Sequence, residues 1–184
     1  YLKDVRKYLK KNNIKKYKII LEPLKKNTAP AILSSALIKE IPLEQPLMYF
    51  AADHLIEKPN ILNRAIRKNK VNLDNENLFI FGIKPKNPSS EYGYFITKKI
   101  KKNIDKIIKF IEKPKIVLAK KIIKDKGYWN SGMFFLRKDS IINSFKKCQP
   151  KTLKSCILAI NKSIYKNNTY YLNKRAFSKS IEKS

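Results

Sequence analysis

The stretch Leu21-Glu22-Pro23-Leu24-Lys25-Lys26-Asn27-Thr28-Ala29-Pro30-Ala31 lies between two different hydrophobic patterns. An apolar run of strand length precedes it at residues 17–20, and an amphipathic segment follows it at 32–38. This order predicts a strand, a turn and then a helix, because Thr and Pro are favoured in the first turn of a helix. Glu22 is thereby expected at the end of the strand, facing the positive end of the helix.

A carboxylate in that position has two interpretations. Guanine presents two adjacent donors, N1–H and the N2 amino group, and a carboxylate that only accepts can bind both together. The same residues are equally compatible with an ordinary connection between a strand and a helix. The eleven residues by themselves leave both interpretations open.

Strand-like and helix-like hydrophobic periods alternate along the rest of the chain, with short connections. This alternation predicts one α/β domain over residues 1–184, with a largely parallel sheet and helices on its faces. The expected strands are 17–22, 47–52, 78–83, 92–97, 104–112 and 132–137, and the expected helices are 2–12, 29–40, 59–70, 115–126, 138–147 and 152–166.

Charged residues directly follow several of the expected strands, where ligands of open α/β sheets bind. Asp53 is suited to Mg²⁺, which takes one or two carboxylates and completes its shell with phosphate oxygens and water; a helix cap is the alternative. Glu112 could accept from two vicinal hydroxyls, Lys113 could contact a phosphate as a point charge, and Asn130 could bind sugar hydroxyls. For these three residues, an ordinary strand end and core packing remain the alternatives.

The formal net charge of +28 raises the question of nucleic-acid binding. Lysine supplies 37 of the 42 basic residues and arginine only 5, and the lysines are scattered without aromatic residues between them. Because phosphate and base recognition recruits arginine for its bidentate geometry, dedicated nucleic-acid binding is not expected. Two cysteines without a CxxC spacing and no long apolar run predict a cytoplasmic protein without a membrane segment.

Taken in order, six short motifs resemble the mannose-1-phosphate guanylyltransferase family over essentially the whole chain. They are LEPxxxNTAPA at 21–31, ADH at 52–54, FGIxP at 81–85, YGY at 92–94, FIEKP at 110–114 and WNSGMF at 129–134. The resemblance implies a Rossmann-like, GT-A-type nucleotidyltransferase fold: an α/β three-layer sandwich with a mixed, mostly parallel sheet, here incomplete at both ends. It also implies the synthesis of GDP-mannose and pyrophosphate from GTP and mannose 1-phosphate.

The resemblance also assigns roles to individual residues. Asp53 and Lys113 would be catalytic, with Asp53 as the ligand of Mg²⁺. Gly93, Glu112, Lys113 and Asn130 would bind the sugar phosphate. The nucleotide would be bound by Glu22, Asn27, Thr28, Ala29 and Pro30, with Glu22 and Asn27 along the guanine.

The chain departs from the family pattern in ways that shape the expected activity. It contains no glycine-rich signature for the triphosphate, and a second metal-binding Asp would lie beyond Ser184. The expectation is therefore a partial nucleotidyltransferase domain with impaired turnover by itself. Another sugar-1-phosphate nucleotidyltransferase and a basic module that binds RNA or other polyanions are the alternative functions, and homo-oligomer formation is left open.

Overall fold

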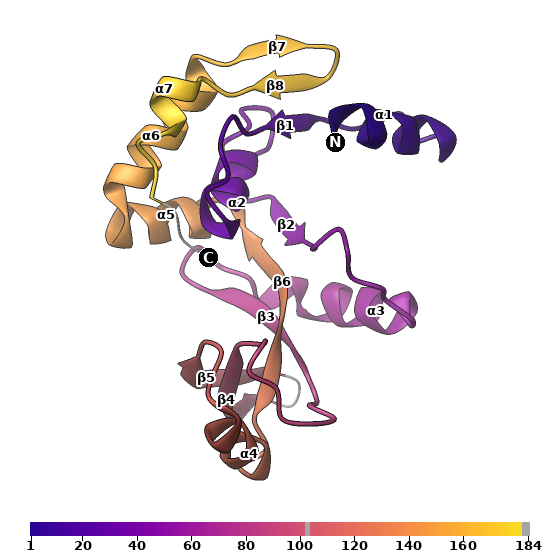
Figure 1. Ribbon diagram of the computed structural model, residues 1–184, viewed down its shortest axis with the longest axis vertical. Coiled ribbons are helices and arrows are strands. Elements are labelled where there is room, and N and C mark those ends of the chain that lie inside the picture. The colour runs from indigo at the N-terminus through magenta and orange to yellow at the C-terminus, as the bar shows by residue number, and fades with distance from the viewer. Residues whose placement is uncertain (102–103, 182–184) are drawn as a thin grey trace. The chain divides into compact units, whose positions relative to one another are not determined.

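The computed structural model describes residues 1–101 and 104–181, which form a mixed α/β structure of two compact units (Figure 1). The first unit combines Tyr1–Leu47, Asn72–Asn77 and Leu136–Ser184, and the second combines Met48–Val71 and Leu78–Phe135. None of the helices in the described part of the chain is long and apolar enough to span a membrane. The α/β class expected from the sequence is confirmed.

A three-stranded sheet and most of the helices make up the first unit. The sheet has the order β1-β8-β7, with β1 parallel to β8 and β8 antiparallel to β7. Its elements are α1 (Leu2–Lys11), β1 (Ile19–Leu21), α2 (Thr28–Ala36), α5 (Lys138–Cys148), α6 (Pro150–Asn161), β7 (Ile164–Lys166), β8 (Thr169–Tyr171) and α7 (Lys174–Phe177).

The prediction of a helix at 152–166 is wrong at its C-terminal end, because α6 ends at Asn161 and a hairpin follows. Asn167 and Asn168 connect β7 to β8 with φ values of 50° and 56°. Two consecutive residues with positive φ form the tight turn that suits the twist of a hairpin, and asparagine is among the residues that tolerate it best. The Asn-Asn pair is the sequence signal for this hairpin.

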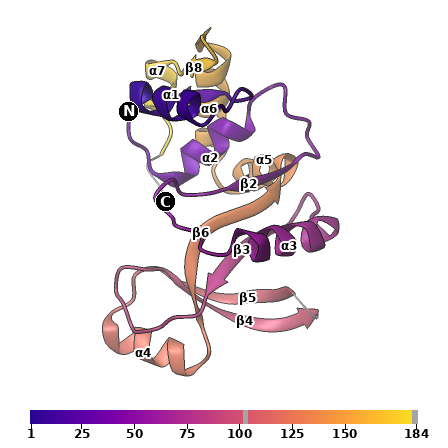
Figure 2. The ribbon, with the colours of Figure 1, turned by 90° about the vertical axis from the view of Figure 1, so that its right-hand side faces the viewer.

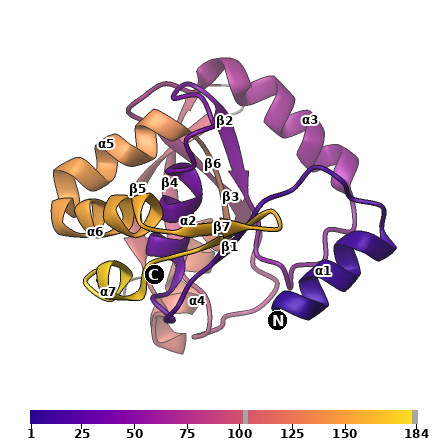
Figure 3. The same ribbon diagram turned by 90° about the horizontal axis from the view of Figure 1, so that it is seen from above.

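The core of the first unit lies around α6, against which α2, α5 and α7 pack. Its buried apolar side chains come from α2, α6 and α7 and from the segments after α2 and β8. Figure 3 shows α5 beside α6. Lys138 is buried at the start of α5 and donates hydrogen bonds to the carbonyl oxygens of Ile38 and Ile41, at 2.9 and 2.8 Å. Burial lowers the pKa of Lys138, and the two carbonyl groups compensate for part of that cost by accepting from the ammonium.

A charged network on the surface of the first unit connects β1, β8 and the segment after α2. Lys18 donates to Glu40, and the Tyr170 hydroxyl donates to the same carboxylate at 3.1 Å. The Lys18 ammonium also lies 5.8 and 5.7 Å from the ring centroids of Tyr165 and Tyr170. The hydrogen bond from Lys18 is the main reason that the pKa of Glu40 falls from 4.5 to about 2.

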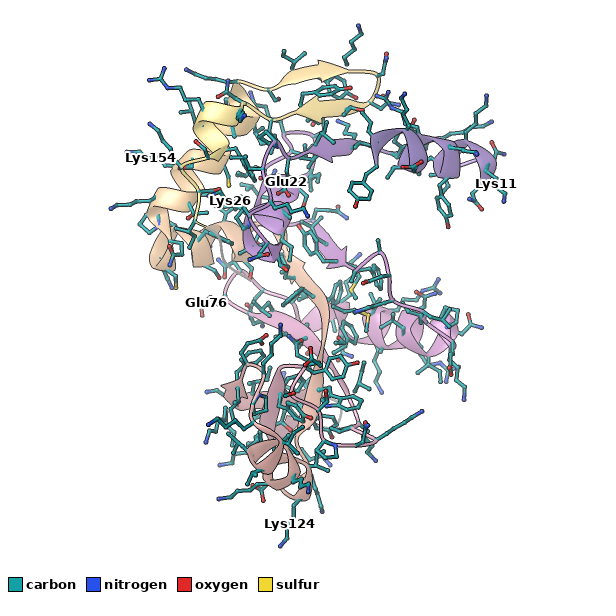
Figure 4. The ribbon with its side chains drawn as sticks, viewed as in Figure 1. Lys11, Glu22, Lys26, Glu76, Lys124 and Lys154 are labelled. Atoms are coloured by element: carbon teal, nitrogen blue, oxygen red, sulfur yellow. The ribbon has the colours of Figure 1, made fainter. Side chains whose placement is uncertain are left out.

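This lowered pKa predicts a pH-dependent contribution of Glu40 to folding stability. A carboxyl group with a lower pKa in the folded state stabilises the fold above its unfolded pKa, and the contribution disappears as the pH falls through the folded pKa. We therefore expect Glu40→Gln to lower the urea midpoint at pH 7 and to have a vanishing effect as the pH falls from about 4.5 toward 2. Glu76→Gln, at an exposed position of the same unit (Figure 4), is the matched control; equal effects of Glu40→Gln at both pH values would contradict the prediction.

A sheet and two helices make up most of the second unit. The sheet has the order β2-β6-β4-β5, and β3 also pairs with β6. Its elements are β2 (Pro46–Tyr49), α3 (Pro59–Asn69), the 3₁₀ turn η1 (Lys70–Asn72), β3 (Leu78–Ile83), β4 (Tyr94–Lys101), β5 (Ile104–Ile111), α4 (Ile116–Lys124) and β6 (Tyr128–Arg137). Figure 2 shows α4 beside β4 and β5.

The core of the second unit lies between β4 and α4. Tyr94 and Ala119 are fully buried there, and Ile122 is 1% exposed. The antiparallel β4–β5 and β4–β6 pairings give the sheet its mixed character, and the described registers contain more antiparallel pairing than the sequence predicted. Tyr94 thus belongs to this core and is also the first residue of β4.

Candidate functional site

Three of the residues expected to bind a sugar phosphate come together at one end of β4 in the second unit. A Cβ atom added to Gly93 would lie 2.7 Å from Oε2 of Glu112 and 3.6 Å from Cβ of Asn130. The Gly93 carbonyl accepts a hydrogen bond from the Asn130 N–H at 2.7 Å. A side chain at position 93 would therefore enter the space of the Glu112 carboxylate and displace it.

Asn130 lies in β6, and a residue of the same strand orients its side chain. Its side-chain oxygen accepts from the Gly132 N–H at 3.0 Å, and Gly132 has a φ of 68°. Because the carbonyl end of the side chain is occupied in this way, a sugar hydroxyl would meet the amino end, which donates. The glycine permits this turn, since other residues rarely adopt such a φ.

The loop before Gly93 is held by the core of the second unit. The hydroxyl of buried Tyr94 accepts from the Ser89 N–H at 2.9 Å and donates to the Ser89 carbonyl at 3.0 Å. The ring of Tyr92 packs at 4.9 Å from the ring of Trp129, centroid to centroid. The loop is therefore held at Ser89 by hydrogen bonds and at Tyr92 by ring packing.

Lys113 has an uncommon backbone conformation next to this cluster. Its φ is 44°, in the left-handed region that lysine rarely adopts, and it stands between exposed Glu112 and buried Pro114. Such strain is found preferentially at ligand-binding positions, where the surrounding structure enforces it. Glu112 and Lys113 directly follow β5, as the sequence predicted.

Asp53 lies in the loop between β2 and α3, four residues after the end of β2, and is exposed. Its neighbour His54 approaches β6 two residues after Asn130, since a Cβ atom added to Gly132 would lie 3.9 Å from Cε1 of His54. The structure therefore brings the Asp53 loop beside the part of β6 that carries Asn130, within the second unit. The strand expected at 47–52 is shorter than predicted, because β2 ends at Tyr49.

The described residues around Asp53 offer few protein ligands for a metal ion. In the described ranges, 1–101 and 104–181, no three His, Cys, Asp or Glu side chains form a group that could hold a metal ion. A lone exposed carboxylate such as Asp53 is compatible only with a cation that takes the rest of its shell from phosphate oxygens and water, as Mg²⁺ does.

The residues expected to bind the nucleotide belong to the first unit. Glu22, labelled in Figure 4, directly follows β1. Its Oε1 atom is buried without a hydrogen-bond partner among the described residues. Burial raises the pKa of the Glu22 carboxyl, and the charge of Glu22 adds to the effect of burial in raising the pKa of the Cys156 thiol. A buried carboxylate oxygen without a donor is costly, and a ligand that supplied N–H groups would remove that cost.

The N-terminus of α2 lies after Glu22 and carries the other four residues. Asn27 has a φ of 60° and precedes the first helical residue, Thr28. Ala29 follows within the first turn, and Pro30 is buried. The N–H groups at the start of a helix have no partners within the helix, so this end attracts ligand acceptors and negative charge.

Trp129 and His54, for which the sequence predicted no binding role, lie near Asn130 and Gly132 in the structure. Trp129 has a buried Nε1 atom without a hydrogen-bond partner in the described part of the chain, and its ring packs between Tyr92 and Tyr94. His54 lies against Gly132 of β6. The only sequence signals were the placement of Trp129 beside Asn130 and of His54 beside Asp53.

Comparison with curated proteins gives relatives from one group of enzymes. The chain is 33% identical over 175 residues to an Escherichia coli mannose-1-phosphate guanylyltransferase, covering 90% of this chain and 38% of that protein. It is 28% identical over 172 residues to the alginate biosynthesis protein AlgA of Pseudomonas syringae, covering 90% of this chain and 35% of that protein. The chain thus spans about a third of the length of these relatives.

Solved structures show the same fold. A crystal structure titled mannose-6-phosphate isomerase from Helicobacter pylori has a TM-score of 0.81 and 31% identity, covering 95% of this chain and 70% of that chain. One titled mannose-1-phosphate geranyltransferase from Thermus thermophilus has a TM-score of 0.73 and 21% identity, covering 88% of this chain and 46% of that chain. The model of the nucleotidyl transferase family matches residues 2–177. The chain belongs to the nucleotidyl transferase family.

Proposed function

We propose that this chain forms part of a mannose-1-phosphate guanylyltransferase, which converts GTP and mannose 1-phosphate into GDP-mannose and pyrophosphate. The observation that carries the proposal is the convergence of Gly93, Glu112 and Asn130 at one end of β4. Relatives that carry this enzyme name, at 33% to 37% identity, support the choice of reaction.

In this proposal the second unit binds the sugar phosphate. Glu112 accepts hydrogen bonds from two vicinal hydroxyls of the mannose ring, and the amide of Asn130 donates to a third polar group. Lys113 contacts the phosphate as a point charge. Gly93 leaves the space that the carboxylate of Glu112 needs, at the 2.7 Å that separates Oε2 from an added Cβ atom.

The first unit binds the guanine in this proposal. Glu22 accepts from N1–H and the N2 amino group, which gives its buried Oε1 atom the donor that it otherwise lacks. Asn27, Thr28, Ala29 and Pro30 form the wall at the N-terminus of α2, with the helix end directed to the nucleotide. Uracil and thymine present acceptors where guanine has donors, so Glu22 disfavours them.

In this reaction the protein aligns the substrates and stabilises charge, and no covalent intermediate with the protein is required. A phosphate oxygen of mannose 1-phosphate attacks the α-phosphorus of GTP, a new P–O bond forms, and pyrophosphate leaves. Lys113 lowers the repulsion between the two phosphorylated substrates and holds the attacking group in line. A divalent cation, for which we propose Mg²⁺ held by Asp53, would neutralise charge on the triphosphate.

The test of the proposal is calorimetric titration of the chain with mannose 1-phosphate and, separately, with GTP and Mg²⁺. We expect binding of both, and we expect Glu112→Gln to weaken mannose 1-phosphate much more than GTP. Glucose 1-phosphate and UTP are the matched ligands of the other nucleotidyltransferases. A folded chain that prefers them, or that binds none of the four, would overturn the proposal.

A charge change at Asp53 tests the metal ligand. We expect Asp53→Asn to reduce by about tenfold the increase in GTP affinity that Mg²⁺ produces, because the cation loses its protein carboxylate. Mannose 1-phosphate affinity without metal should stay within twofold of the unsubstituted chain. Glu57→Gln, another exposed carboxylate of the same unit, is the control; an unchanged Mg²⁺ effect in Asp53→Asn would remove Asp53 from the metal site.

A further inference from the structure

A cavity of about 540 Å³ in the first unit lies apart from every residue assigned above. It lies between α1, the segment that follows α1, and the turn of the β7–β8 hairpin. Figures 1 and 3 both show α1 beyond the tip of that hairpin, on the side away from α5 and α6. The volume falls within the range of cavities that bind small molecules.

The lining of this cavity is positively charged. It includes Arg6, Lys10 and Lys15, together with the polar groups of Tyr17, Asn167 and Asn168. The described residues that line it include no Asp or Glu. By contrast, Lys18 and Arg137 of the same unit pair with the carboxylates of Glu40 and Asp139. Three cations around one cavity without an acidic residue in its lining favour an anionic ligand.

Arg6 is held in place by the hairpin. Its Nη2 atom donates to Oγ1 of fully buried Thr169 at 2.9 Å and to the carbonyl oxygen of Asn167 at 3.4 Å. A guanidinium group has five N–H donors in a rigid fork, so contacts through one nitrogen leave donors for a phosphate. Arg6 is one of only 5 arginines in a chain with 37 lysines.

We propose that this cavity binds a small anion with two or more phosphoryl groups, of the pyrophosphate or nucleotide class. Three cations match the charge of such an anion, and the Nε and Nη1 groups of Arg6 keep N–H donors for phosphate oxygens while its Nη2 group is bound to the hairpin. A concave site with one anchored arginine suits a compact ligand better than it suits an extended nucleic-acid strand, which needs a basic groove with stacking aromatic residues. The proposal is independent of the substrate site.

Titration of the chain with inorganic pyrophosphate at low salt tests the proposal. We expect Lys10→Gln to weaken binding at this site by at least fivefold, and the amide NMR signals of Asn167 and Asn168 to shift during the titration. Lys11→Gln is the matched control, because Lys11 is the next residue on the same helix, is exposed and lies outside the lining of the cavity (Figure 4). It should change the affinity by less than twofold.

Arg6→Lys is a second variant that keeps the charge and removes the fork. We expect it to weaken pyrophosphate binding by at least threefold, with the circular dichroism spectrum unchanged. GTP and mannose 1-phosphate, titrated against the same amide signals, show whether the ligand is a nucleotide or the phosphoryl groups alone suffice. Either result with local shifts at Asn167 and Asn168 supports the site.

Three results would overturn the proposal. The first is an equal loss of affinity in Lys10→Gln and Lys11→Gln, which would indicate attraction to the net charge alone. The second is pyrophosphate binding without a shift of the Asn167 and Asn168 amide signals. The third is tighter binding of a mixed-sequence RNA than of pyrophosphate, with a loss of about 10³-fold or more between 50 and 200 mM salt, which would indicate a nucleic-acid surface.

Discussion

Gly93→Ala should weaken the binding of mannose 1-phosphate by about a hundredfold while the chain remains folded. The added Cβ atom would lie 2.7 Å from Oε2 of Glu112 and 3.1 Å from Cζ of Phe110. The carboxylate is the far end of a flexible side chain, so it can swing away without disturbing the sheet. Because that carboxylate is the proposed acceptor for the sugar hydroxyls, its displacement removes the contact that positions mannose. A hundredfold change corresponds to ~2.7 kcal/mol of binding free energy.

Gly82→Ala is the matched control for this prediction. A Cβ atom there would lie 2.9 Å from Cζ of Phe95 and 2.9 Å from Cβ of Tyr128, within packed aromatic groups. We expect this variant to lose about 1–3 kcal/mol of folding stability and to keep its affinity for mannose 1-phosphate in the folded fraction. Calorimetric titration and urea unfolding measure both quantities. Normal sugar-phosphate affinity in Gly93→Ala would show that Glu112 is not the acceptor.

The second large effect is expected for Glu22→Gln, with GTP affinity falling by about 30- to 300-fold. Glutamine can accept through one oxygen but presents an amino group where guanine needs a second acceptor. The buried Oε1 atom of Glu22 has no partner among the described residues, and burial raises the pKa of the carboxyl. A raised pKa means that the charged carboxylate is less favourable in the folded chain than in the unfolded chain.

The stability of Glu22→Gln separates a binding role from a structural one. A carboxyl group with a raised folded pKa destabilises the fold as the pH rises from its unfolded pKa through the folded value. Replacing it by a neutral amide should therefore leave the urea midpoint at pH 7 unchanged or higher, although GTP affinity falls. A drop in stability together with unchanged preference for GTP over ATP would refute the guanine-binding role of Glu22.

Much of the fold could be predicted from hydrophobic periodicity. Helix α3 begins at Pro59 and strand β3 covers Leu78–Ile83, as the sequence indicated, because proline marks the first turn and a short apolar run marks a strand, although none of the residues of β3 is fully buried. The errors lie at element ends. The expected strand at 132–137 begins earlier, at Tyr128, since Trp129 and Asn130 pair or bond with the segment around Gly93, a long-range contact that periodicity does not report.

The sequence predicted that the candidate site residues follow strands, but it did not predict which of these residues contact one another. Glu22 and Glu112 do follow β1 and β5 directly, because chain direction alone places them there. The contact between Gly93 and Glu112 depends on the antiparallel pairing of β4 with β5, in which Tyr94 faces Ile111. No local pattern encodes that register. The left-handed backbone of Lys113 is equally invisible in sequence, since only asparagine and glycine signal such conformations with any regularity.

The pairing of β1 with β8 has a consequence for the order in which the chain acquires structure during synthesis. Ile19 lies opposite Thr169, so the chain must be synthesised beyond Thr169 before this parallel pair can form. The second unit uses only residues between Met48 and Phe135, so the residues of its core are all synthesised before Thr169. We therefore expect Gly93, Glu112 and Asn130 to reach their folded arrangement before β1 pairs with β8.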